Sequence, residues 1–260
     1  MRLHPQFENH HDMLFPNISA KVINLLSIFL IAFGISSFHT HRNSNDDRFV
    51  YYIVNPKEKE LQFHYKDEKG NTFKSIQSLK QWLEKKNKTL LFAMNGGMYK
   101  KDNSPLGLYI ENSKTISKLN TEKGYGNFYL QPNGVFYITA ERLPSISTTN
   151  EFKEKKNIEY ATQSGPMLVI KGKINPVFKE GSANLNIRNG VGILPGNKVI
   201  LAMSKHEVNF YDFAKFFKDM GCISALYLDG FVSRTYFPEK NWIQLDGNFG
   251  VMIGIIKNKN

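Results

Sequence analysis

The sequence contains a single cysteine, Cys222, among 260 residues. One thiol cannot form a disulfide within the chain, and it cannot supply the ligands of a cysteine metal cluster. Because Cys222 lies in an apolar stretch, we expect it to be a small buried core residue. Cysteine usage therefore excludes two kinds of cross-link but leaves the cellular compartment open.

Common catalytic and binding motifs are also missing. The sequence has no Gly-x-Ser-x-Gly elbow, Walker A loop, His-Glu-x-x-His pair or Gly-x-Gly-x-x-Gly loop, which gives no support to serine hydrolases, nucleotide-binding proteins or zincins. Zinc-finger, RNP-like and basic-zipper patterns are absent too. The net charge is +11, but the lysines are scattered and their small clusters include glutamate, as on a solvated surface. We therefore do not expect nucleic acid as a partner.

Only one long apolar run is present, Val22–Phe38. Its 17 residues are at the lower limit for a membrane-spanning helix and slightly above the usual core of a signal peptide. A buried core helix is less favoured, because the run has no polar stripe at helical spacing. We expect a signal peptide or a membrane anchor, with translation starting at Met1 or at Met13. The protein should then be periplasmic, extracellular or membrane-anchored and facing outward.

The rest of the chain has the pattern of a single folded domain at 48–257, after an N-terminal tail at 1–21 and a linker at 39–47. Short apolar runs between turn signals predict many strands, and apolar residues at helical spacing predict two helices. The expected fold is α/β (α+β), with a mixed β-sheet core and flanking helices. Helices are expected at 75–86 and 209–220, and strands at 49–54, 60–65, 89–94, 107–111, 134–139, 166–171, 190–194, 199–203, 225–228 and 249–256.

Three short apolar strands end abruptly in polar, glycine-containing corners. Ligands commonly bind at strand ends, where glycine lets backbone N–H groups approach an anionic or sugar ligand. The plainer alternative is an ordinary turn in which Asn or Asp caps its own backbone. The three corners are Asn95-Gly96-Gly97, Gln163-Ser164-Gly165 and Asp229-Gly230.

Among ionisable residues, Asp229 is the best candidate for catalysis. Partial burial at a strand end would raise its pKa and suit it to general acid or base work. Arg188 precedes the strand at 190–194, and its guanidinium could hold a phosphate with two parallel hydrogen bonds. His206 and Glu207 are more typical of an exposed pair before a helix.

Five segments, in order over roughly residues 48–256, resemble blocks of the phosphodiester glycosidase domain family. That family includes a lysosomal enzyme that removes N-acetylglucosamine from a phosphate-linked mannose. The segments are Asn95-Gly96-Gly97-Met98-Tyr99 with Asp102, Pro105, Gly107 and Leu108; Gln131-Pro132-Asn133-Gly134-Val135-Phe136; Gln163-Ser164-Gly165-Pro166-Met167-Leu168; Arg188 with Gly190, Val191, Gly192 and Ile193; and Leu228-Asp229-Gly230 with Ser233.

The resemblance implies an exported hydrolase that cleaves a glycosidic bond to phosphate in an envelope or extracellular glycan. Two alternatives remain open: a non-catalytic protein that binds anionic glycans, and a hydrolase of plain cell-wall or capsule glycosides. The implied catalytic residues are Asp229, Arg188 and Asn95. The implied substrate-binding residues are Gly96, Gly97, Gln163, Ser164, Gly165, Gly230, Ser233 and Arg234.

The sequence departs from the family at Phe231-Val232, where a glycine-rich run is usual, and Arg234 then adds a cation. We expect this to reshape the pocket. No cofactor is expected, although a divalent cation stays open, with Asp102 and Asp246 as candidate ligands. The expected partners are a phosphorylated glycan or sugar phosphodiester and, if the apolar run is not cleaved, the membrane.

Export is directly testable. Residues 1–45 contain the apolar run, so their fusion to a reporter that is active only outside the cytoplasm should give signal. The matched control is the same reporter fused to residues 46–260, which should give none. A silent fusion that is expressed and stable would contradict export.

Overall fold

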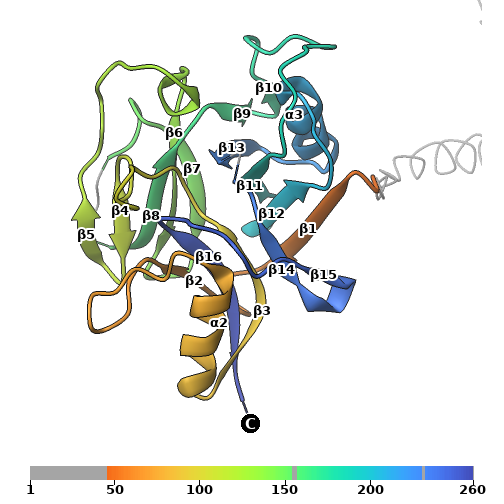
Figure 1. Cartoon of the computed structure of the whole chain (residues 1–260). Coiled ribbons are helices and arrows are strands. Elements are labelled where there is room, and N and C mark those ends of the chain that lie inside the picture. Colours follow the sequence, from red (N-terminus) through yellow and green to blue (C-terminus); the bar gives the residue numbers. More distant parts are fainter. Residues whose placement is uncertain (1–45, 154–156, 230–231, 260) are drawn as a thin grey trace, which may run out of the picture. The chain divides into compact units, whose positions relative to one another are not determined.

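The computed structural model of the chain describes residues 46–153, 157–229 and 232–259 (Figure 1). The predicted tail, the apolar run and most of the linker lie outside these residues, as does Gly230. Within the described ranges, no helix has the length and apolar character needed to cross a bilayer.

The first of three antiparallel sheets has six strands (Figure 1). Its central strand β11 pairs with β12 on one side and with β13 on the other, and the ladder with β13 shifts register at Asn189/Gly190. In spatial order it consists of β1 (Phe49–Val54), β12 (Lys198–Ser204), β11 (Asn189–Leu194), β13 (Ser224–Asp229), β9 (Met167–Ile170) and β10 (Lys173–Ile174).

The second and third sheets are also antiparallel. The second consists of β15 (Trp242–Ile243), β14 (Thr235–Phe237), β3 (Lys88–Asn95), β16 (Met252–Asn258) and β2 (Glu60–His64). The third consists of β5 (Lys114–Ser117), β4 (Tyr109–Glu111), β8 (Ile158–Ser164), β6 (Gly134–Thr139) and β7 (Pro144–Thr148). Two short 3₁₀ helices, η1 (Asn127–Tyr129) and η2 (Pro238–Lys240), lie in the connections.

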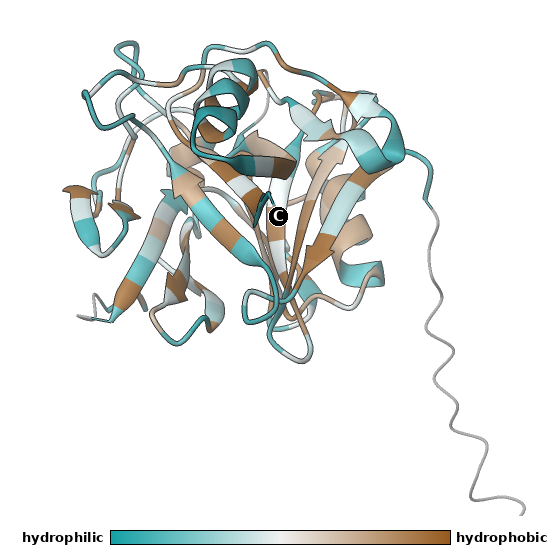
Figure 2. Ribbon diagram, turned by 90° about the horizontal axis from the view of Figure 1, so that it is seen from below, coloured by the Kyte–Doolittle hydropathy of each residue, from teal (hydrophilic) through white to brown (hydrophobic). Residues whose placement is uncertain are grey.

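The largest apolar core lies between the three sheets and draws side chains from each of them. Tyr52 of β1 contacts Phe92 of β3, with ring centroids 5.3 Å apart, and so joins the first sheet to the second. Phe63 of β2 contacts Tyr160 of β8 at the same separation and joins the second sheet to the third. Brown, hydrophobic segments accordingly concentrate along the strands, while the connecting loops are largely teal (Figure 2).

Each of the first two sheets has a helix on its outer face. Helix α2 (Ile76–Lys85) begins at the N-cap Ser75, whose hydroxyl accepts from the backbone N–H of Ser78, and it packs on β3 of the second sheet. Helix α3 (Phe210–Asp219) begins at Asn209, whose side chain accepts from the N–H of Asp212 at 2.8 Å. Such caps satisfy donors that have no partner within the helix. Helix α3 packs on the first sheet.

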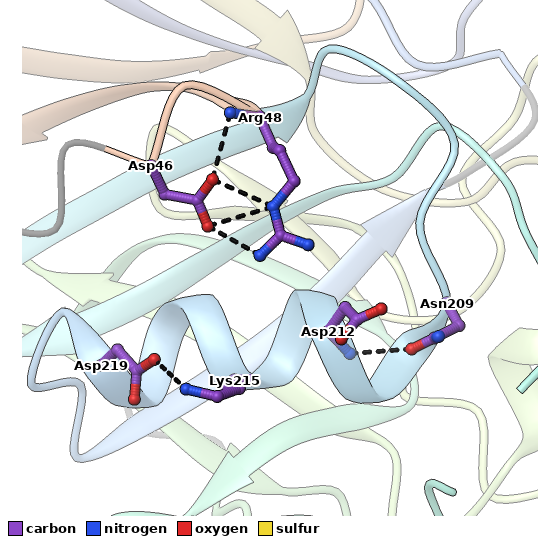
Figure 3. A network of polar contacts seen from close by, with 6 residues as sticks. All are labelled: Asp46, Arg48, Asn209, Asp212, Lys215 and Asp219. Atoms are coloured by element: carbon purple, nitrogen blue, oxygen red, sulfur yellow. Dashed lines mark hydrogen bonds and ion pairs between the residues drawn. The ribbon is translucent and has the colours of Figure 1, made fainter. Parts of the chain in front are cut away.

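A polar contact network lies beside α3 (Figure 3). Asp46 accepts hydrogen bonds of 2.8–3.2 Å from the side chain of Arg48, which fixes the start of β1. These bonds lower the pKa of Asp46. On the helix itself, Lys215 pairs with Asp219 one turn later. Exposed pairs of this kind contribute little to stability, so the packed face of α3 holds it in place.

The predicted α+β class and single domain are confirmed, and every strand pair among the described residues is antiparallel. Both helices were predicted to within one residue at each end, and the strands at 49–54 and 134–139 have the predicted bounds. Cys222 is buried, as expected. Six strands were not predicted: β5, β7, β8, β10, β14 and β15.

Three phenylalanines of α3 face the first sheet and are buried: Phe213, Phe216 and Phe217. Phe213 is fully buried, with its ring centroid 5.1 Å from that of Phe217. We therefore expect Phe213→Ala to lower the free energy of unfolding by about 3–5 kcal/mol, because it removes apolar contacts and leaves a cavity. Urea denaturation measures this.

The matched control is Ile223→Ala, because the Ile223 side chain is 53% exposed just beyond the same helix. It should change the free energy of unfolding by no more than about 0.5 kcal/mol. Equal stability of Phe213→Ala and the parent protein would contradict the packing of α3 on the first sheet.

Candidate active site

The three polar corners predicted from the sequence meet in the structure, each at the end of a strand from a different sheet. Asn95 ends β3, Ser164 ends β8 and Asp229 ends β13. The side-chain Nδ2 of Asn95 donates to Oδ2 of Asp229 at 3.3 Å, and the Ser164 hydroxyl donates to the Leu228 carbonyl at 2.8 Å. The junction of the three sheets therefore places one carboxylate on a rigid base.

Asn95 is the centre of a buried hydrogen-bond network. Its Oδ1 accepts from Nδ2 of Asn189 at 2.8 Å and from the backbone N–H of Arg234 at 3.0 Å. Asn189 in turn uses its Oδ1 to accept from the backbone N–H of Asp229 at 2.8 Å. Asn95 and Asn189 are both fully buried. Together the two amides fix both the backbone and the carboxylate of Asp229.

Asp229 is partly buried and lines an open pocket of about 440 Å³. Burial raises the pKa of the nearby Tyr99 phenol, and the charge of Asp229 raises it further. The pocket is lined by Met98, Tyr99, Lys100, Lys101, Leu106, Tyr125, Gly126, Asn127, Phe128, Asp229 and Val232.

The lysines of this pocket are carried by a fixed turn. Lys100 donates its N–H to the Ser104 carbonyl at 2.8 Å, and Asn103 donates its N–H to the Lys100 carbonyl at 2.9 Å. The buried side chain of Asn103 also donates to the carbonyls of Asn248 and Phe249. Since the turn is tied to the body of the domain, Lys100 and Lys101 place two positive charges at the pocket that contains Asp229.

Arg188 is fully buried and does not line this pocket. Its Nε donates to the Val208 carbonyl at 2.8 Å and its guanidinium carbon lies 3.7 Å from the centroid of the Phe210 ring. Another amino group binds the carbonyl and Oδ1 of Asn184, whereas Nη1 has no hydrogen-bond partner among the described residues. Burial lowers the pKa of Arg188, an effect that the Tyr227 phenol opposes.

Tyr227 contacts Arg188, and its pKa depends on the charges of both Arg188 and Asp229. Burial raises the pKa of its phenol, the charge of Arg188 lowers it, and the charge of Asp229 raises it again. The Asn127 side chain acts in the same direction as Arg188. The Arg188 guanidinium carbon lies 5.6 Å from the centroid of the Tyr227 ring, and Asp229 follows Tyr227 by two residues in β13.

The side-chain amide of Gln163 makes its hydrogen bonds within the protein. Its Oε1 accepts from the N–H groups of Leu108 and Asn120, and its Nε2 donates to the Asn120 carbonyl and to the Thr149 hydroxyl. With 1% of its surface exposed, Gln163 has no free group facing the pocket. It anchors a loop, and a role in substrate binding stays a prediction.

The three described corner glycines are required by close packing. A Cβ at Gly96 would lie 2.8 Å from Cγ1 of Ile253, and one at Gly97 would lie 2.5 Å from Oγ1 of Thr162. A Cβ at Gly165 would lie 2.5 Å from that of Asn133. These contacts let strands approach one another, so a role in substrate binding stays a prediction. Gly230 lies outside the described residues.

Ser233 and Arg234 lie next to the network. The buried Ser233 hydroxyl donates to the Asp229 carbonyl at 3.3 Å. The Nε of Arg234 donates to both carboxylate oxygens of Asp246 at 2.9 Å, so that part of the guanidinium is already engaged. Across the described ranges, no three His, Cys, Asp or Glu side chains are grouped closely enough to hold a metal ion.

Sequence reasoning missed Asn189, Tyr227, Lys100 and Lys101 as site residues. Asn189 had a local signal, since it is an asparagine at the start of an apolar strand, next to Arg188. Tyr227 looked like an ordinary strand residue, and the two lysines like solvated surface. Their proximity to Asp229 depends on long-range strand pairing, which the sequence does not display.

Removing the side-chain amide of Asn95 should destabilise the protein. We expect Asn95→Ala to lower the free energy of unfolding by about 1–3 kcal/mol, because the buried Nδ2 of Asn189 and the N–H of Arg234 both lose Asn95 Oδ1 as an acceptor. The control Asn157→Ala removes an exposed amide bonded to Glu141 and should cost less than about 0.5 kcal/mol. Urea denaturation of both variants measures the difference. Equal effects would mean that the Asn95 network adds no stability.

Comparison with known proteins agrees with this geometry. A family model described as phosphodiester glycosidase matches residues 88–253, from the start of β3 into β16. The Escherichia coli (strain K12) protein YigE, which is uncharacterized, is 38% identical over 186 residues, covering 71% of this chain and 72% of YigE.

Solved structures share the fold. The catalytic domain of zebrafish N-acetylglucosamine-1-phosphodiester alpha-N-acetylglucosaminidase, in a form auto-inhibited by its pro-peptide, aligns with a TM-score of 0.56 at 16% identity, covering 82% of this chain and 84% of that one. A hypothetical protein from Synechocystis aligns with a TM-score of 0.51 at 12% identity, covering 80% and 59%. The family model and the identity with YigE decide the assignment: the chain belongs to the phosphodiester glycosidase family.

Proposed function

We propose that the protein is an exported hydrolase that cleaves the bond between a sugar and phosphate in a sugar 1-phosphodiester of an envelope or extracellular glycan. Membership of the phosphodiester glycosidase family supports the reaction class. The apolar run Val22–Phe38 supports export, with the membrane as a partner if that run is retained.

The observation that carries this proposal is the combination of charges at the pocket. Of the described residues that line it, Asp229 alone is a carboxylate, and Lys100 and Lys101 are the cations. Hydrolysis of an ordinary glycoside normally uses two carboxylates, one of them a proton donor to the leaving oxygen. A phosphate departs as a stable anion, so it needs less help from a general acid. One carboxylate opposite two lysines suits a phosphate leaving group better than a plain alcohol.

The bond that breaks joins the anomeric carbon to a phosphate oxygen, which keeps the electron pair. Asp229 stabilises the positive charge that develops on the anomeric carbon, or accepts a proton from the attacking water. The products are a free sugar and a phosphomonoester. Asn95 holds the carboxylate in place through its 3.3 Å hydrogen bond, which makes it a positioning residue.

The departing phosphate is stabilised by positive charge on two sides. Lys100 and Lys101 are exposed at the pocket and can contact phosphate oxygens directly. Arg188 acts from the interior, where its buried charge is poorly screened and therefore strong. Such pre-positioned charges lower the energy of a transition state in which negative charge develops.

Replacing the Asp229 carboxylate distinguishes a catalytic role of this residue from a structural one. We expect Asp229→Asn to reduce turnover of a sugar 1-phosphodiester by about 10²–10⁴-fold, the usual effect of losing a positioned acid–base group. The melting temperature should change little, because asparagine also suits a strand-end turn. Turnover and melting temperature are measured on the same preparations, against both N-acetylglucosamine 1-phosphodiesters and plain N-acetylglucosaminides.

The matched control is Asp219→Asn, which removes an exposed carboxylate of α3 that pairs with Lys215. It should leave turnover unchanged. A much lower melting temperature for Asp229→Asn, with full activity of the folded fraction, would make Asp229 a structural cap. Faster turnover of plain glycosides than of phosphodiesters by the parent protein would contradict the proposed substrate class.

A further inference from the structure

We propose that Tyr125 is a specificity-determining residue that stacks on a ring carried on the far side of the substrate phosphate. This inference rests on the proposed function, because it assumes that Asp229 binds at the anomeric carbon. It adds a preference for an aglycone that contains a ring, such as a second sugar, over an alkyl group.

The first observation is the exposure of Tyr125. Its side chain is fully exposed and lines the same pocket as Asp229. The other exposed large apolar side chains of the described residues have 38–58% of their surface exposed. A fully exposed aromatic ring contributes nothing to the core, so folding alone gives no reason for it at the edge of this pocket.

The second observation is that the loop bearing Tyr125 is anchored on both sides. On one side, Gln163 accepts from the Asn120 N–H at 2.9 Å and donates to the Asn120 carbonyl at 2.7 Å. On the other side, η1 follows directly and Phe128 is buried. A Cβ at Gly107 would lie 2.6 Å from the Phe128 ring, so this anchor is closely packed. Residues 121–127, between the two anchors, are all exposed.

The glycines on either side of Tyr125 explain how its ring reaches the pocket edge. Gly126 has φ +92°, a conformation that residues with a side chain rarely adopt. A Cβ at Gly124 would lie 2.6 Å from the Tyr129 ring, so the chain there passes directly over that ring. Glycine is therefore favoured on both sides of Tyr125, whose own side chain is fully exposed.

The charge distribution of an aromatic ring indicates which group the Tyr125 side chain would contact. Aromatic faces carry partial negative charge, and the C–H groups on one face of a sugar ring carry partial positive charge, so the two attract when stacked. Lys100 and Lys101 are exposed at the same pocket and hold the phosphate in the proposed mechanism. With the reacting sugar at Asp229 and the phosphate at the lysines, the group beyond the phosphate is the part that extends to Tyr125.

The test compares two diesters of N-acetylglucosamine 1-phosphate, one esterified to O6 of methyl glucoside and one to methanol. We expect Tyr125→Ala to lower kcat/KM for the sugar diester by about 10-fold, mainly through KM, because a stacking contact is lost. The methyl diester should be cleaved equally well by parent and variant. Tyr125→Phe keeps the ring and should behave like the parent protein.

Ile116→Ala is the matched control, since it truncates a 48% exposed side chain of β5 that does not line the pocket. It should change neither substrate. Equal losses on both diesters, or no loss on either, would overturn the stacking role while the proposed hydrolase activity stands.

A binding measurement separates failure of the inference from failure of the proposed function. If the parent protein cleaves neither diester, the proposed function fails, and calorimetric titration of both diesters still examines Tyr125. Weaker binding of the sugar diester alone to Tyr125→Ala would support the subsite. Equal affinity for parent and variant, or no binding to the parent, would overturn it.

Discussion

The site depends on one buried amide, that of Asn95. Its oxygen accepts from Asn189 and from the Arg234 backbone, while its nitrogen donates to Asp229. These partners lie on or beside strands of two sheets, so the network closes only when both sheets are in register. A buried polar group without a partner costs about 1–3 kcal/mol. Any packing that displaces the Asp229 carboxylate therefore also breaks hydrogen bonds in the interior, so the fold and the geometry of the candidate site are specified together.

The second buried polar group of this region is the Arg188 guanidinium. Arg188 packs against Phe210 and Tyr227, and among the described residues its side chain donates to carbonyl and amide oxygens, not to a carboxylate. A charge held this way is costly unless it serves another charge. The charges of Arg188 and Asp229 both act on the pKa of the Tyr227 phenol, in opposite directions. In the proposed mechanism this buried positive charge stabilises the departing phosphate anion.

Sequence patterns predicted the framework well and the site only in part. Strands such as β1 and β6 alternate or concentrate apolar residues between clear turns, and their bounds were predicted. Strand β8 was missed because its last residues, Thr162-Gln163-Ser164, are polar yet buried. The corners of Asn95 and Asp229 were found from local chemistry. Asn189 was missed because its role follows from pairing with Asp229, forty residues away along the chain, and such register is fixed by packing of the whole sheet.

The residues whose side chains are used within the domain differ from those that are exposed at the pocket. Gly97, Gln163 and Asn95, which belong to the segments that resemble the family, have their space or hydrogen bonds used within the domain. They preserve the placement of Asp229 whatever the substrate. Lys100, Lys101 and Tyr125 are exposed at the pocket and constrain little of the interior. We therefore expect substitutions there to change the fold hardly at all and, under the proposed function, to alter which group fits beyond the reacting sugar. Family membership supports the reaction class, and our proposal assigns the choice of substrate to these exposed side chains.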